Sequence, residues 1–233
     1  MYYKFLNGDK SPVSGVLKEL GFKEDSFTYK INEVNICDNF DENMLHGGGF
    51  YFADEKNILN FLGYGMTVYD VIIPEDAKVI KFTDEVDEIK SDKIILINPR
   101  KVDKTFVEKM FNEGAVISND KIVGVIHDLI TQKEYDLAKI IFEKIDFNNE
   151  KLLDEITRLN IPSELLDTYK QVYSKATSPE VITYLYNIAS YQNLYHHNKY
   201  SIENLVLSNI AKNLDKPIKE IVNEYIKNEE IVK

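Results

Sequence analysis

The hydrophobic pattern of the chain changes its period near residue 102, and this change constrains the fold more than any other feature. Before it, apolar residues gather in short runs rich in β-branched and aromatic side chains, which are typical of strands. After it, they recur every three or four residues, which predicts amphipathic helices. A chain of 233 residues is long enough to bury a core in each part. We therefore predict an α+β protein with a small mixed domain at 1–102 and an all-helical domain at 103–233.

Several segments of the first domain predict strands. Residues 67–73 are rich in β-branched residues and stop at Pro74. Residues 93–97 are continuously apolar, which indicates a strand covered on both faces, and Pro99 is expected to close it. A short helix is expected after Asp54, which has the character of an N-cap. Further strands are expected at 27–31, 49–53 and 77–82.

The second domain shows a series of helix start signals in which Ser, Asn or Pro precede most of the apolar stripes. Two successive intervals between these starts together approach the length of an ankyrin repeat. The ankyrin signature Thr-Pro-Leu-His is absent from the chain. The helices are therefore expected to form either a non-repeating bundle or a degenerate ankyrin-like repeat.

Composition limits the classes of partner. The chain has 28 Lys and Arg against 39 Asp and Glu, a net charge of -11. Nucleic acids and anionic membranes both attract proteins through Lys and Arg, so we expect neither as a partner. No apolar run approaches the roughly 20 residues of a membrane helix. With the single cysteine Cys37 excluding an internal disulfide, these features predict a cytoplasmic protein.

No motif in the chain points to catalysis. The adjacent His196 and His197 diverge on a helix and cannot chelate a metal as an i, i+4 pair would. Cys37 has no neighbouring base. A P-loop, a Gly-x-Ser-x-Gly element and a dinucleotide-binding glycine motif are all missing. We therefore expect no catalytic residue, no metal and no cofactor.

The run from His46 to Asp54 is the least generic part of the sequence. Its three consecutive glycines permit positive φ angles and a close backbone approach, either to a ligand or to a neighbouring strand. In one interpretation they form a tight turn into a strand, with Phe50 and Phe52 in the core. In the other, the segment binds a ligand, for which the candidate residues are His46, Gly49, Tyr51 and Tyr64.

The element Gly-Phe-Tyr-Phe-Ala-Asp at 49–54, followed by a helix and a strand, resembles the central stretch of ADP-ribosyltransferases. In that family a His and a Tyr hold NAD, and a Glu on a later strand stabilises the oxocarbenium-like transition state. The resemblance implies an NAD site around His46 and Tyr51. Here His46 directly precedes the glycine-aromatic element. Glu85 and Glu88 fall in an acidic run that is expected to be solvated.

A second resemblance covers roughly residues 1–100. The pattern consists of Gly-Gly-Phe-Tyr-Phe at 48–52, Gly-Tyr-Gly at 63–65, Ile-Pro-Glu-Asp-Ala-Lys-Val at 73–79 and Asp-Lys-Ile-Ile-Leu at 92–96. It resembles the N-terminal domain of ankyrin-associated proteins in giant viruses of the mimivirus group. This family implies a viral interaction protein with a helical repeat tail, and it implies no established chemistry.

Tyrosines crowd one stretch of the second domain. Tyr184, Tyr191 and Tyr195 share one helical face with Ile188, because their spacings are four, three and four residues. Such a stripe either packs into a core or supplies the stiff, amphipathic contact area of a protein interface. These three tyrosines are the candidate partner-binding residues.

The leading interpretation is a non-enzymatic adaptor whose helical half binds another protein. It would act in the cytoplasm, which is the host cytoplasm if the protein is viral. One alternative is an ADP-ribosyltransferase-like enzyme or an NAD-binding relic. A second alternative is a virion or assembly component that acts by self-association.

Overall fold

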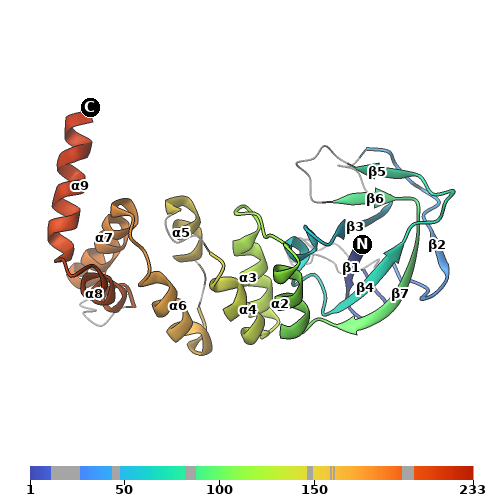
Figure 1. The fold of residues 1–233 in the computed structure, drawn as a ribbon, viewed down its shortest axis with the longest axis horizontal. Coiled ribbons are helices and arrows are strands. Elements are labelled where there is room, and N and C mark those ends of the chain that lie inside the picture. The colour runs from blue at the N-terminus through green and yellow to red at the C-terminus, as the bar shows by residue number, and fades with distance from the viewer. Residues whose placement is uncertain are drawn as a thin grey trace. The chain divides into compact units, whose positions relative to one another are not determined.

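The computed structural model describes residues 1–11, 27–43, 48–81, 88–145, 149–157, 159, 161–195 and 202–232. These residues form an α+β protein, with an antiparallel sheet followed by helices (Figure 1). They divide into two compact units, Met1–Leu137 and Ala138–Lys233, which we call the sheet unit and the helical unit.

The sheet has seven strands in the order β2-β7-β4-β1-β3-β6-β5, and every neighbouring pair is antiparallel. The first strand of the chain therefore lies at the centre, and β2 and β5 are the two edges. The strands are β1 (Tyr2–Leu6), β2 (Val34–Ile36), β3 (Phe50–Asp54), β4 (Thr67–Ile72), β5 (Val79–Lys81), β6 (Ile89–Ser91) and β7 (Lys93–Lys101).

The strands expected at 49–53, 67–73 and 77–82 are confirmed as β3, β4 and β5. The strand expected at 93–97 is present as β7, but the prediction that Pro99 closes it is wrong. β7 continues to Lys101 because its register against β4 shifts between Val68 and Asp70, which leaves room for the proline.

The prediction of a strand at 27–31 is also wrong, because this segment makes only isolated bridges at Thr28 and Ile31. The side chain of Asn35 replaces a neighbouring strand there. Its Oδ1 accepts from the Lys30 N–H at 2.8 Å, and its Nδ2 donates to the Lys30 carbonyl at 2.9 Å. The strands β1, β2 and β6 were not expected.

One face of the sheet carries the main core, whose members come from five of the strands and from the segment that precedes β2. They are Leu6, Tyr29, Phe50, Phe52, Tyr69, Val71, Ile89, Ile94 and Leu96. On the opposite face, the helix α2 (Lys104–Asn112) covers the centre of the sheet. The ring of Phe106 lies edge-on to the rings of Tyr3 and Phe5, with centroid distances of 6.2 Å and 6.1 Å.

The helix expected after Asp54 is the short 3-10 helix η1 (Ile58–Phe61), and the Asp54 carboxylate accepts from the N–H of Asn57 at 3.1 Å. Within the sheet unit, η1 is tied to the segment before α3 (Ile122–Thr131), since Asn60 Oδ1 accepts from the Ser118 N–H at 2.8 Å. Strands therefore give way to helices near residue 102, whereas the compact units divide later, within α4 (Tyr135–Phe142).

The helical unit contains α5 (Glu150–Thr157), η2 (Ser163–Leu165), α6 (Leu166–Tyr173), α7 (Pro179–Tyr195), α8 (Ile202–Leu214) and α9 (Ile218–Val232). Its core includes the buried rings of Tyr169 and Tyr173, which stack with their centroids 4.2 Å apart. Burial raises the pKa of both tyrosines far above the ordinary value. None of the helices in the described part of the chain has the length and apolar character needed to cross a bilayer.

The close contact between Gly65 and β1 gives a first testable prediction. A Cβ on Gly65 would lie 2.2 Å from the carbonyl carbon of Leu6, whereas one on Gly124 of α3 would meet nothing within 4 Å. Gly65→Ala should therefore destabilise the fold by about 3 kcal/mol through overpacking. The matched variant Gly124→Ala should stabilise it by about 0.5 to 1 kcal/mol, because alanine favours a helix. Urea unfolding followed by circular dichroism measures both, and equal effects would contradict the packing at Gly65.

Candidate functional site

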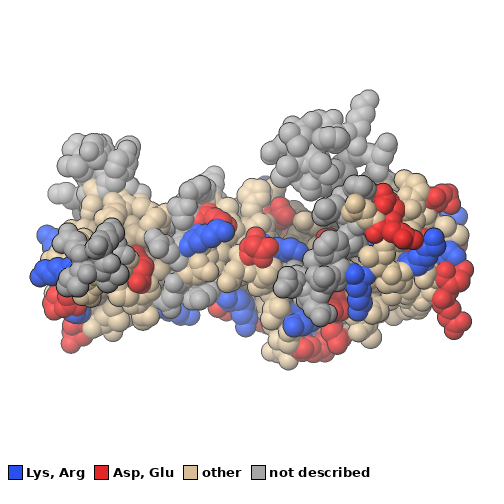
Figure 2. Space-filling view, turned by 90° about the horizontal axis from the view of Figure 1, so that it is seen from above, with Lys and Arg blue, Asp and Glu red and all other residues tan. Residues whose placement is uncertain are grey.

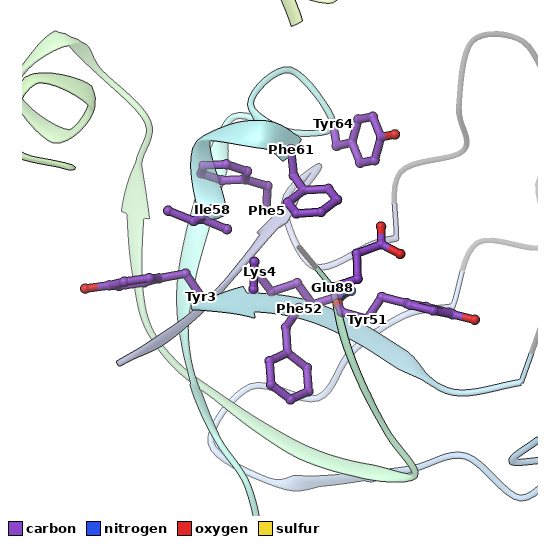
Figure 3. Close-up of a pocket in the computed structure, with 10 residues that line it drawn as sticks. Tyr3, Lys4, Phe5, Tyr51, Phe52, Ile58, Phe61, Tyr64 and Glu88 are labelled. Atoms are coloured by element: carbon purple, nitrogen blue, oxygen red, sulfur yellow. Dashed lines mark hydrogen bonds between the residues drawn. The ribbon is translucent and has the colours of Figure 1, made fainter. Parts of the chain in front are cut away.

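A small cavity lies beside the junction of β1 and β3 (Figure 3). These strands pair only at Tyr2 with Asp54 and at Tyr3 with Ala53. Just beyond, Lys4 Nζ donates to the backbone carbonyl of Tyr51. The cavity measures about 70 Å³ and is mostly aromatic and apolar. Its lining comprises Tyr3, Lys4, Phe5, Tyr51, Phe52, Ala53, Ile58, Phe61, Tyr64 and Glu88.

Of the four residues predicted for ligand binding, the structure brings two together. Tyr51 from β3 and Tyr64 from the turn after η1 both line the cavity. Gly49 does not line it and instead lies against Lys90. His46 lies outside the described residues. The prediction of a ligand site at these residues remains a prediction.

Glu88 is a lining residue that the sequence did not single out. The expectation that it is solvated is wrong, because it is half-buried against the cavity. It directly precedes β6, and the pairing of Ile89 with Phe52 brings it next to Ala53, on the cavity that Tyr51 also lines. In Figure 3 its carboxylate points towards the side of Phe61 and Tyr64.

The ionisation of Tyr64 reflects these surroundings. Burial raises the pKa of its hydroxyl above the ordinary value, and the carboxylates of Glu88 and Asp128 raise it further, whereas Lys121 lowers it. At neutral pH the hydroxyl is therefore a hydrogen-bond donor and not a base. In Figure 3 the hydroxyls of Tyr51 and Tyr64 both point away from the rings of Phe5 and Phe61.

The size of the cavity limits what it can hold. Small-molecule sites usually enclose about 300 to 1,000 Å³, so a cavity of about 70 Å³ admits a group of a few atoms and not a dinucleotide. Within the described residues, no three His, Cys, Asp or Glu side chains gather in a way that could hold a metal ion.

The packing of Lys90 explains why position 49 is a glycine. The side chain is fully buried, and its Nζ donates to the carbonyl of Asn43 at 2.9 Å. The rings of Phe40 and Tyr51 lie 5.7 Å and 5.3 Å from the amine. A Cβ on Gly49, whose φ is +149°, would lie 2.5 Å from Lys90 Cε. The missing side chain of Gly49 thus makes room for a buried lysine that no local sequence signal reveals.

The helical unit has a larger hollow of about 380 Å³ between α7, α8 and α9, which we call the helical groove. It is lined by Tyr186, Ala189, Ser190, Asn204, Leu207, Ser208, Ala211, Ile218 and Lys219. Of the three tyrosines predicted to bind a partner, Tyr184 is half-buried on α7 and does not line the groove. The side chains of Tyr191 and Tyr195 lie outside the described residues.

Charge offers no further candidate on the surface shown in Figure 2. Basic and acidic side chains of the described residues are interspersed there, and neither sign dominates the view. No family model, no curated protein and no solved structure matches the chain. The case for a function therefore depends on the geometry of the chain itself.

Replacing Glu88 tests the geometry of the cavity. Glu88→Gln should lower the pKa of Tyr64, because the lost negative charge no longer opposes the tyrosinate. A pH titration of tyrosine Cζ resonances by NMR measures this, with Tyr64→Phe assigning the signal. The control Glu55→Gln removes the same charge elsewhere on the sheet unit and should leave Tyr64 unchanged. An unaltered Tyr64 titration in Glu88→Gln would contradict the placement of Glu88.

Proposed function

We propose that the protein is a non-enzymatic, cytoplasmic interaction protein that binds another protein in the helical groove. The observation that carries this proposal is the volume of the groove together with its lining of small and aromatic side chains, because a hollow of about 420 Å³ beside α2 is as large but is lined mainly by charged residues. At about 380 Å³ it falls within the range of known binding sites, whereas the cavity beside β1 does not. If the resemblance to giant-virus proteins holds, the protein is viral and its helical half is a degenerate ankyrin-like repeat.

The lining of the groove suits a protein segment as its ligand. Ala189, Ser208 and Ala211 are small, so they leave space into which a partner can insert a side chain. Tyr186 supplies a rigid aromatic wall, and tyrosine is among the residues that contribute most to protein interfaces. Ser190 adds a hydroxyl for orienting the inserted segment.

The tyrosine of α7 that lines the groove is Tyr186 and not the predicted Tyr184. Tyr186 follows Tyr184 by two residues, which places it about 200° further around the helix. The face proposed to bind a partner is therefore the one that carries Tyr186. Tyr184 faces a different direction.

A pair of neighbouring substitutions on α8 tests the groove. Ser208 and the adjacent Asn209 are both exposed, but only Ser208 lines the groove. A phage-displayed library of random peptides would be selected on the wild-type protein. Ser208→Arg should weaken binding of the selected peptides at least about tenfold, or about 1.4 kcal/mol, because the long side chain fills the groove. Asn209→Arg adds the same charge outside the groove and should bind like the wild type.

Thermal melts of both variants should match that of the wild type, which would show that the fold is retained. Peptides that bind both variants as tightly as the wild type would remove the groove as the partner site. Peptides that both variants lose equally would indicate a response to the added charge instead of the shape of the groove.

A second candidate function is binding of NAD, as the resemblance to ADP-ribosyltransferases implies. The observation in its favour is that Tyr51, Tyr64 and Glu88 line one cavity. A dinucleotide exceeds this volume, so binding would require the cavity to open. This candidate is therefore second to the helical groove.

Calorimetry separates the two candidates. Titration with NAD to about 1 mM should give no saturable heat if the interaction proposal holds, because the cavity is too small. Saturable binding that is lost in His46→Ala and in Tyr51→Ala would overturn this expectation and favour the NAD site.

A further inference from the structure

The two edges of the sheet differ in how they protect their open backbone. Lys78 precedes the edge strand β5 and Lys81 ends it. Both lysines are exposed, and their charge discourages further strand pairing. The edge strand β2 reads Val34-Asn35-Ile36 and contains no charged residue and no proline. Val34 is 45% exposed and Ile36 is 53% exposed.

The backbone of β2 is oriented to accept another strand. Asn35 is paired with Ile94, and the Cys37 N–H donates to the Asp92 carbonyl at 2.8 Å. Residues of an antiparallel strand alternate between bonding one neighbour and bonding the other. The N–H and C=O groups of Val34 and Ile36 therefore point outward from the edge. Within the described part of the chain, none of these groups has a hydrogen-bond partner on that side.

The exposed side chains of β2 continue an apolar row across the sheet. Val34 lies opposite Ile95 of β7, which in turn lies opposite Ile72 of β4. Directly paired residues project from the same face, and Ile72 is 46% exposed. The edge thus combines open hydrogen-bonding groups with an uncovered apolar face, which is the combination that another strand would satisfy.

We propose that a second copy of this chain docks on β2, by antiparallel pairing of β2 with β2 about a two-fold axis at Asn35. In this register Val34 faces the partner's Ile36, and Ile36 faces the partner's Val34. Each of these two pairs exchanges both of its main-chain hydrogen bonds, because all of the groups involved point outward. The pairing joins the two sheets into one and extends the apolar row across the axis.

The charges that flank β2 permit a second copy as the occupant. In the proposed register Glu33 faces the partner's Cys37, and Asp38 faces the partner's Asn32, so no like charges are opposed. The contact is isologous and closes after two subunits. A three-residue strand buries less than the roughly 1,200 Å² of a stable interface, so the dimer is weak and concentration-dependent.

Sedimentation velocity from about 1 µM to about 1 mM tests the proposal on the full chain. The wild type should shift from monomer to dimer across this range. Ile36→Lys should remain monomeric, because it places a charge in the new strand pair. The matched control Val79→Lys changes a 41% exposed valine on the opposite edge strand and should dimerise like the wild type. A monomeric wild type, or an equal effect of both variants, would overturn the proposal.

Cysteine cross-linking tests the register in a Cys37→Ser background. Directly paired residues that exchange hydrogen bonds have Cα atoms about 5.5 Å apart, within reach of a disulfide. The double variant Val34→Cys/Ile36→Cys should form a covalent dimer under mild oxidation, and Val34→Cys alone should not. A dimer linked by Val34→Cys alone would overturn the proposed axis, because it would pair Val34 with itself.

Discussion

The sheet depends on its central strand, β1. Four register pairs join β1 to β4, but only two pairs, Tyr2 with Asp54 and Tyr3 with Ala53, join it to β3. Because β6 and β5 attach to the sheet through β3, these two pairs hold three strands in place. The cavity beside β1 opens where this pairing ends, and the Lys4 amine bonds the Tyr51 carbonyl there. The candidate site is thus a direct consequence of how the sheet is joined at its centre.

The same region shows how a pattern suited to ligand binding can serve packing. Glycines beside aromatic residues suggest a backbone that approaches a ligand. At Gly49 the approaching group is the stem of Lys90, which is fully buried and lies close to two aromatic rings. A buried ammonium needs hydrogen-bond acceptors and aromatic faces to offset its lost hydration. The backbone carbonyl of Asn43 and the rings around Lys90 meet that need.

Local composition predicted the strands whose pattern is strong by itself, such as β4, and it predicted the change from strands to helices. It missed β1, although the aromatic residues of that strand favour a strand, and it missed β2 and β6 because three residues are too few to show a pattern. Ile-Lys-Ser in β6 has no alternation that a strand would require. The residues of the candidate site divide in the same way, into those that local sequence reveals and those that strand pairing brings in. Tyr51 belongs to a recognisable run, whereas Glu88 reaches the cavity only through the pairing of β6 with β3, which links residues far apart in sequence.

The two proposed surfaces reinforce each other because they lie on different units of the chain. The β2 edge belongs to the sheet unit, and the helical groove belongs to the helical unit, so the two proposals involve different residues. A dimer through β2 carries two grooves. A partner whose two copies of the binding segment span both grooves would engage the second groove at a high effective concentration, and its overall affinity would exceed that of a single groove. Weak self-association would in this way control how strongly the helical units hold a multivalent partner.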